Sequence, residues 1–209
     1  MAGRIVVFGA TGGTGRAVVE AALAQGHAVT AFVRDPAKLD RAGVVAMKGD
    51  VLDAGAVERA VPGHDAVVCA LGTPATTKAV VRSQGTRNIV HAMQKAGVRR
   101  LIAISSIGIG DSKPMLPFLY KRILVPLLLK QGFAEHELQE ACIRDSGTEW
   151  TIVRPGALTN GERTGKYVSG TNVSGVAIRA KISRADVADF VMKDLAARTY
   201  VHATPWISY

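Results

Sequence analysis

Short apolar runs alternate with amphipathic stretches along most of the chain. Runs of strand length, rich in Val, Ile, Ala and Leu, lie at residues 4–8, 28–33, 44–47, 66–70, 101–105 and 150–153. Stretches with helical spacing of apolar residues lie between most of them, at 14–25, 54–60, 84–96 and 134–145. The apolar runs are continuous rather than alternating, which indicates strands that are covered on both faces. Strand–helix alternation with right-handed crossovers then predicts an α/β fold with a doubly wound parallel sheet of Rossmann type.

Glycines mark the points where several predicted helices end. Gly26, Gly97 and Gly147 each lie just after a helical stretch, where a left-handed backbone stops a helix. A further helix over 185–196 begins with the capping box Ser183-Arg184-Ala185-Asp186, and the tail 200–208 is a candidate last strand. No linker, repeat or low-complexity stretch interrupts the pattern. Residues 1–209 are therefore expected to form a single domain.

The first predicted strand leads directly into the glycine-rich turn Gly9-Ala10-Thr11-Gly12-Gly13-Thr14-Gly15. One glycine permits a tight turn, a second lets backbone approach a diphosphate, and a third lets helix and strand pack closely. The helix that follows offers free N–H groups and the positive end of its dipole to an anion. Strand, turn and helix belong to one unit of about 30 residues, as in dinucleotide-binding folds. The turn therefore predicts a dinucleotide site that comprises Gly9, Thr11, Gly12, Gly13, Thr14 and Gly15.

The end of the second predicted strand distinguishes between two cofactors. Enzymes that use NAD place an acidic residue there, which accepts a hydrogen bond from the ribose 2′-hydroxyl. In this chain the strand ends with Arg34, which can bind a 2′-phosphate in a bidentate manner, and Lys38 adds positive charge nearby. Asp35 can instead cap the next turn or pair with Lys38. The pattern favours NADPH as the cofactor, with NADH as the second choice.

Two further loops are expected at the same edge of the sheet. Asp50 and Val51 follow the third strand, where the carboxylate can meet the adenine amino group and the valine can pack on the ring. An N-cap for the next helix is an equally weighted role for Asp50. Leu71 and Gly72 follow the fourth strand, at the topological switch point where ligands bind in such sheets.

Composition narrows the classes of partner. The net charge is +9, but the basic residues are scattered and lack aromatic interleaving, so we expect no nucleic-acid partner and a basic surface that attracts anionic ligands. The most apolar later stretch, 116–129, contains Lys121, Arg122 and two prolines, so no membrane span is expected. The five histidines show no metal-ligand spacing, which predicts no metal. Cys69 and Cys142 are expected to be core residues in a reducing compartment, the cytoplasm.

Several segments, spread over nearly the whole chain, carry a family resemblance. They are Gly9–Gly15, Val33–Asp35, Gly49–Leu52, Asp65–Val68 with Leu71–Thr73, and Gly85–Val90. Together they resemble the atypical short-chain dehydrogenase/reductases, and within them the biliverdin reductase B or flavin reductase group with its bacterial NAD(P)H-binding relatives.

The resemblance implies roles for individual residues. It places the family's active-site serine at Ser106 and sets the loop 154–158, which includes Pro155, beside the nicotinamide. Human-type members carry a histidine at the position of Gly156. Any contribution of that histidine to tetrapyrrole binding is therefore absent here, which puts biliverdin itself in question as the acceptor. The residues that it implies for NADPH are Thr11, Gly13, Thr14, Arg34, Lys38, Asp50 and Val51, with Leu71 and Gly72 beside it.

The Tyr-x-x-x-Lys pair of ordinary short-chain dehydrogenases is absent from the chain. In those enzymes the lysine lowers the tyrosine pKa for proton transfer to a carbonyl, so ordinary ketone reduction is not expected here. A flavin, quinone or linear tetrapyrrole accepts hydride without a strong protein acid, and the protein then contributes chiefly positioning. The sequence therefore predicts an NADPH-dependent oxidoreductase that acts on such a planar acceptor. The alternative is a redox-sensing regulator that binds NADP without turnover.

Two segments are expected to form the acceptor pocket, about 106–133 and 154–182. Within the first, residues 114–133 interrupt the alternation and combine apolar with basic side chains, which favours a lid or pocket wall. Core packing and a dimer contact are the alternative roles for this segment. The chain is accordingly expected to be a monomer or a homodimer.

Overall fold

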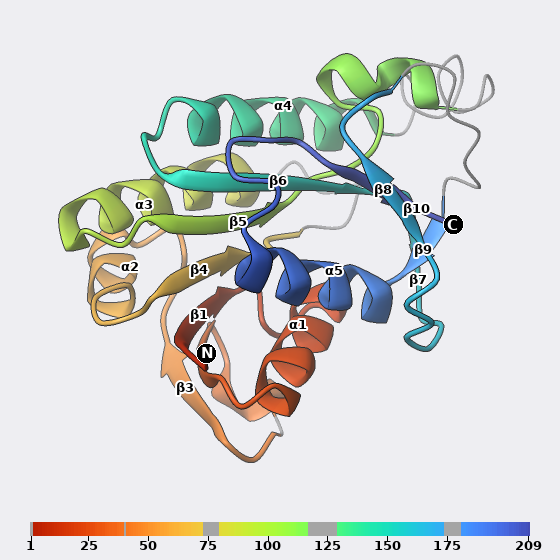
Figure 1. Cartoon of the computed structure of the whole chain (residues 1–209). Coiled ribbons are helices and arrows are strands. Elements are labelled where there is room, and N and C mark those ends of the chain that lie inside the picture. The colour runs from red at the N-terminus through yellow and green to blue at the C-terminus, as the bar shows by residue number, and fades with distance from the viewer. Residues whose placement is uncertain (1, 40, 73–79, 117–128, 174–180) are drawn as a thin grey trace.

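The computed structural model describes residues 2–39, 41–72, 80–116, 129–173 and 181–209. Its centre is an eight-stranded sheet with the order β3-β2-β1-β4-β5-β6-β10-β8, in which every pairing is parallel except that of β8 with β10 (Figure 1). The strands are β1 (Arg4–Phe8), β2 (Ala28–Val33), β3 (Val44–Lys48), β4 (Ala66–Cys69), β5 (Arg100–Ile104), β6 (Glu149–Pro155), β8 (Val168–Gly170) and β10 (Trp206–Ser208). The predicted Rossmann-type α/β fold is confirmed.

Helices cover both faces of this sheet. Two of them, α1 and α5, pack together on one face, while α2, α3 and α4 form the layer on the other (Figure 1). Two 3₁₀ helices, η1 and η2, lie in loops. The helical elements are α1 (Gly13–Ala24), η1 (Pro36–Lys38), α2 (Ala54–Ala60), α3 (Val81–Ala96), η2 (Gly110–Met115), α4 (Lys130–Arg144) and α5 (Arg184–Ala197).

The central strand β1 shows why the apolar runs are continuous. Ile5 and Val7 belong to the hydrophobic cluster under α1 and α5, whereas Val6 and Phe8 belong to the cluster on the opposite side of the sheet. All four side chains are at most 1% exposed. Since successive side chains of a strand point to opposite faces, a strand that is covered on both faces must be apolar at every position.

The order of the strands reverses between β1 and β4. β1 pairs with β2 on one side and with β4 on the other, so that Val7 lies opposite both Ala31 and Val68. The loops that follow these strands diverge in opposite directions and leave a crevice at the carboxyl edge of the sheet. The glycine-rich turn lies at this point.

The structure differs from the sequence prediction mainly near the C-terminus. β8 was not predicted, and a separate parallel pair consists of β7 (Ala157–Thr159) and β9 (Lys181–Ser183). These strands are three residues long, which is too short for a periodic pattern. The candidate tail strand 200–208 is confirmed only at 206–208, as β10. Most of the predicted lid segment 114–133, and residues 174–180 of the second pocket segment, lie outside the described residues.

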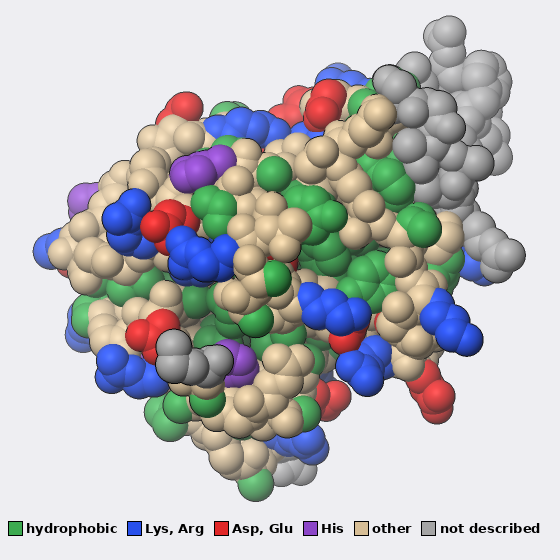
Figure 2. Space-filling view, viewed as in Figure 1, with side chains coloured by type: hydrophobic (Ala, Val, Ile, Leu, Met, Phe, Trp, Pro, Cys, Tyr) green, Lys and Arg blue, Asp and Glu red, His purple; other side chains and the backbone are tan. Residues whose placement is uncertain are grey.

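Surface charge follows the scattered pattern seen in the sequence. Figure 2 shows Lys and Arg side chains spread over one face of the molecule, with Asp and Glu side chains among them. Ion pairs at the surface include Lys95 with Glu58 at 2.6 Å and Lys113 with Glu137 at 2.9 Å. Such pairs contribute little to stability because solvent screens them.

Candidate functional site

Close backbone approach explains the outer glycines of the turn. Gly9 has φ +81°, and a Cβ at this position would lie 2.4 Å from the carbonyl oxygen of Ala70. A Cβ at Gly15 would lie 2.2 Å from the carbonyl oxygen of Gly9. A side chain at Gly9 would therefore push the end of β1 away from the loop after β4, and one at Gly15 would push α1 away from the end of β1. Gly9 and Gly15 are thus required by packing, in the tight turn and in the helix–strand contact that the sequence predicts.

The first turn of α1 is open to an anion. Gly12 is the N-cap of this helix, and no side chain accepts a hydrogen bond from its first N–H groups. Asp53, by contrast, caps α2 through the N–H of Ala56 at 3.1 Å. A helix N-terminus without a capping side chain leaves N–H donors and the positive end of the dipole available to a phosphate.

A cavity of about 560 Å³ lies along the carboxyl edge of the sheet, over this helix N-terminus. The ends of β1, β2, β3 and β4 contribute to its wall, as the switch point requires. The predicted binding residues that line it are Gly9, Thr11, Gly12, Gly13, Thr14, Arg34, Asp50, Val51, Leu71 and Gly72.

Four predicted site residues lie outside this wall. Gly15 serves packing, as described above, and Pro155 is buried in β6, where its carbonyl accepts a hydrogen bond from the N–H of Ile107 at 3.0 Å. Lys38 lies beside Asp35 at 3.9 Å, and 70% of its side chain is exposed. Ser106 is half-buried after β5, and its Oγ donates to the carbonyl oxygen of Ile107 at 3.0 Å.

The structure separates the two roles considered for Asp50. Its Oδ1 accepts a hydrogen bond from the N–H of Leu52 at 3.0 Å in a local turn, and Asp50 lines the cavity. The N-cap of α2 is Asp53. The prediction of Asp50 as N-cap was therefore wrong. A turn separates β3 from α2, so the helix begins three residues later and Asp53 is its N-cap. Asp35 does cap the next turn, since its Oδ1 accepts from the N–H of Ala37 at 3.2 Å.

The cavity wall also includes residues that the sequence analysis did not select. Arg82 on α3 and Arg184 at the start of α5 add positive charge, and Phe32, Val81 and Leu158 add apolar surface. Arg184 lies against the glycine turn, since a Cβ at Gly13 would be 2.7 Å from its Nε. The sequence predicts a role for Arg184 only as part of a capping box. No sequence signal links it to a turn that lies 171 positions away (184 − 13).

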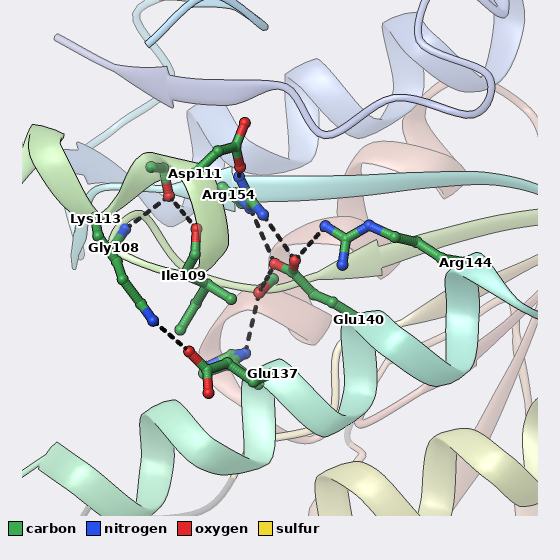
Figure 3. Close-up of polar contacts among 11 residues, drawn as sticks. Gly108, Ile109, Asp111, Lys113, Glu137, Glu140, Arg144 and Arg154 are labelled. Atoms are coloured by element: carbon green, nitrogen blue, oxygen red, sulfur yellow. Dashed lines mark hydrogen bonds and ion pairs between the residues drawn. The ribbon is translucent and has the colours of Figure 1, made fainter.

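A buried ionic network holds the loop that carries Ser106 (Figure 3). The Arg154 guanidinium on β6 donates to both carboxylate oxygens of Glu140 on α4, from Nε at 3.0 Å and from Nη2 at 2.8 Å. Ser105, the neighbour of Ser106, donates to Glu140 at 2.7 Å. Arg154 also pairs with Asp111 on η2 at 2.5 Å. The network therefore links β5, β6, η2 and α4 beneath the loop.

The charges of this network stay fixed near neutral pH. Burial alone would raise the pKa of Glu140, but hydrogen bonds from Arg154 and Ser105 outweigh it and hold that pKa below the ordinary value. Burial likewise opposes the charge of Arg154, and its bonds to Glu140 and Asp111 nevertheless raise its pKa. Both side chains are 1% exposed, so each charge depends on the other for its solvation.

Tyr167 comes near a lysine in space although the Tyr-x-x-x-Lys pattern is absent. The Nζ of Lys193 lies 3.4 Å from the Tyr167 hydroxyl, which donates to Asp189 at 2.9 Å. Burial and the bond to Asp189 raise the pKa of Tyr167, the reverse of what a proton donor to a carbonyl needs. Tyr167 does not line the cavity. This pair does not reproduce the dehydrogenase pair.

The residues present fit a dinucleotide. The uncapped α1 N-terminus suits a diphosphate, and the missing side chain at Gly13 lets Arg184 lie against the turn. Among the described residues, three arginines, Arg34, Arg82 and Arg184, and a single carboxylate, Asp50, line the wall. Within the described part of the chain, no group of three His, Cys, Asp or Glu is placed to hold a metal ion. No helix in that part is long and apolar enough to cross a bilayer.

Comparisons with known proteins agree with this arrangement. A chloroplastic protein of Arabidopsis thaliana is 35% identical over 176 residues, which cover 79% of this chain and 62% of the relative. A (4-alkanoyl-5-oxo-2,5-dihydrofuran-3-yl)methyl phosphate reductase of Streptomyces griseus is 30% identical over 195 residues, 92% of this chain and 60% of the relative. The chain thus spans about three fifths of the length of each.

A solved structure and a family model extend these comparisons. The anaerobilin reductase ChuY from Escherichia coli O157:H7 superimposes with a TM-score of 0.81 at 26% identity, over 98% of this chain and 96% of that protein. The model of the NAD(P)H-binding family matches residues 9–198, which begin at the first glycine of the turn and include Arg34, Asp50, Ser106 and Arg184. The chain belongs to the NAD(P)H-binding family.

Proposed function

We propose that this protein is an NADPH-dependent reductase that transfers hydride to a conjugated acceptor such as a flavin, a quinone or a biliverdin-like tetrapyrrole. One observation carries the proposal: a 560 Å³ cavity joins an uncapped helix N-terminus to an arginine-rich wall at the switch point of the sheet. Two of the similar proteins are reductases by name, of anaerobilin and of a dihydrofuranone methyl phosphate. Their names support a reductase and leave the acceptor of this chain to experiment.

The preference for NADPH over NADH rests on Arg34. It follows the last residue of β2, is exposed, and lines the cavity. A guanidinium in this place binds a 2′-phosphate with two parallel hydrogen bonds, whereas a 2′-hydroxyl is usually bound by a carboxylate. Asp35, the nearest carboxylate along the chain, caps η1 and lies beside Lys38. Lys38 would add long-range attraction for the phosphate rather than a direct contact.

The chemistry that we propose asks the protein for positioning more than for acid catalysis. A bound dihydronicotinamide supplies hydride, two electrons with one proton, to the acceptor, and water protonates the delocalised anion that results. Ser105 is committed to Glu140, which leaves the hydroxyl of Ser106 to orient the acceptor or the carboxamide. We assign Ser106 this orienting role because, among the described residues, its hydroxyl bonds to the adjacent carbonyl of Ile107, a bond that a rotation about χ1 exchanges.

The test is oxidation of NADPH by purified protein, followed by absorbance at the nicotinamide band, with FMN, FAD, a quinone or biliverdin as acceptor. We expect turnover with at least one acceptor and a slower rate with NADH. A parallel titration measures NADPH binding without an acceptor. Measurable binding together with no oxidation by any acceptor would refute the reductase and favour the alternative, a redox-sensing regulator that binds NADP without turnover.

The compartment that we propose is the cytoplasm. Cys69 is buried and Cys142 is half-buried, and both are free thiols. Burial raises the pKa of each thiol, so both remain in the unreactive protonated form. Paired cysteines would be expected in an oxidising compartment.

A further inference from the structure

Arg82 is a buried cation on the wall of the cavity. It is the second residue of α3, only 8% of its surface is exposed, and it lines the cavity beside Val81 and Leu71. A charged side chain is rarely buried to this extent unless it is paired. Arg82 therefore needs an explanation that packing alone does not give.

The described residues do not pair this cation. Its Nε is buried and has no hydrogen-bond partner among them, and none of their carboxylates forms an ion pair with its guanidinium. The acidic residue that influences it most, Glu135, accepts hydrogen bonds from the N–H and the Oγ of Ser83, at 3.1 Å and 3.0 Å. Arg100 and Arg154, the other buried arginines, each pair with a buried carboxylate at 2.6 Å and 2.8 Å. Burying a charge without a partner is costly, so the described residues leave this cation suited to an anionic ligand.

Two further titratable neighbours of Arg82, His136 and Cys69, are uncharged and do not compensate its charge. Burial, with the nearby charge of Arg82, lowers the pKa of His136 to about 3, so this imidazole is neutral near pH 7. Burial raises the pKa of the Cys69 thiol, which is also uncharged. Glu135 acts on Arg82 through space and forms no ion pair with it, so the guanidinium can still attract an anion, and the low local polarity strengthens that attraction.

The position of Arg82 relates it to the acceptor rather than to the diphosphate. The α1 N-terminus and Arg184 belong to the helix layer on one face of the sheet, whereas Arg82 is on α3, in the opposite layer. Its neighbour His136 lies 3.3 Å from the Oγ of Ser105, the residue before Ser106. Arg82 is thus on the side of the cavity that leads to the loop after β5.

We propose that Arg82 binds an anionic substituent of the acceptor, a carboxylate or a phosphate, and so selects acidic conjugated acceptors over neutral ones. This inference rests on the proposed reductase function, because it assumes that an acceptor occupies the cavity beside the cofactor. Arg82 lines the cavity, and a guanidinium can donate two parallel hydrogen bonds to the oxygens of either group. The apolar side chains of Val81 and Leu71 on the same wall would contact the planar part of the acceptor.

The experiment compares acceptors that share a ring system and differ in charge. FMN and riboflavin differ by one phosphate, and biliverdin and its dimethyl ester differ by two carboxylates. Binding is measured by flavin fluorescence or tetrapyrrole absorbance with NADP⁺ present, which keeps the cofactor side filled without turnover. We expect the wild-type protein to bind the acidic member of at least one pair about tenfold more tightly than its neutral partner.

Arg82→Met should bring that ratio close to one, and Arg82→Lys should retain part of it. Arg87→Met, an exposed arginine on the same helix that does not line the cavity, is the control and should leave the ratio unchanged. Thermal unfolding of each variant checks the fold, and the lysine variant keeps the test valid if the methionine variant is unstable.

The outcomes separate this inference from the reductase proposal. Charge-dependent binding that needs Arg82, without NADPH oxidation, would support the anion site and refute the reductase. NADPH oxidation with the same preference among acceptors in Arg82→Met as in the wild type would support the reductase and refute the anion site. Loss of NADP⁺ affinity alone would assign Arg82 to the cofactor, and no dependence on Arg82 in either acceptor pair would overturn the inference.

Discussion

Replacing Glu140 with glutamine removes the negative charge that solvates the buried Arg154 guanidinium. Both side chains are 1% exposed, and the other carboxylate within reach of Arg154 is Asp111, which is 61% exposed. Removing one partner of a buried pair typically costs about 3–5 kcal/mol, because the remaining charge stays buried. The glutamine oxygen still accepts a hydrogen bond from Arg154, so we expect a loss near the lower limit, about 3 kcal/mol. That is a large fraction of the roughly 5–15 kcal/mol that stabilises a typical domain.

Glu137 on the same helix provides the matched control (Figure 3). It pairs with Lys113 at 2.9 Å, but the two side chains are 49% and 56% exposed. An exposed pair of this kind contributes about 0–1 kcal/mol, so Glu137→Gln should have almost no effect. The two variants make the same chemical change one turn apart and differ in burial.

Urea unfolding followed by tryptophan fluorescence measures both variants, because Trp150 and Trp206 are buried at 9% and 5% exposure. The Glu140→Gln midpoint should move to lower urea with an unchanged slope, since the surface exposed on unfolding stays the same. In a thermal scan the same loss corresponds to about 6–12 °C for a chain of this length. If the free energies of unfolding of Glu140→Gln and Glu137→Gln agree within about 1 kcal/mol, the reasoning from burial is wrong.

Three further predictions concern acid stability and the cofactor site. The pKa of Glu140 is lower in the folded than in the unfolded chain, so its stabilising effect is present above about pH 4.5 and is lost as the pH falls. The difference in the free energy of unfolding between wild type and Glu140→Gln should therefore become smaller below about pH 4.5. A difference that grew at lower pH would contradict the lowered pKa. Gly15→Ala places a Cβ 2.2 Å from a backbone oxygen and should weaken NADPH binding at least tenfold or prevent folding, whereas Gly132→Ala in α4, with no atom within 4 Å, should be neutral in the same titration. Arg34→Ala should weaken NADPH binding about tenfold or more and NADH binding little, with exposed Arg59→Ala as control; equal losses for the two cofactors would rule out the 2′-phosphate role.

The sequence alone determined the architecture and the glycine-rich turn at the switch point, because both follow from local rules. Continuous apolar runs such as Arg4–Phe8 indicate strands covered on both faces, and their alternation with helices leaves few topologies other than a parallel doubly wound sheet. The glycines of the turn follow from the same logic, since Gly9 and Gly15 lie where backbone must approach backbone. Arg34 was predictable as well, because the tip of the second strand always faces the same crevice in this topology.

The tertiary structure alone decided which distant side chains meet at that crevice. Arg82 and Arg184 come from two helices in opposite layers, and only the packing of those layers directs both to one cavity. The pairing of Arg154 with Glu140 depends in the same way on how α4 lies over β6. Local periodicity fixes which face of an element is apolar, but it carries no information about which polar residues of different elements face each other. The glycine-rich turn at the crevice could therefore be predicted from the sequence, whereas the buried Arg82 on the cavity wall could be recognised only in the folded chain.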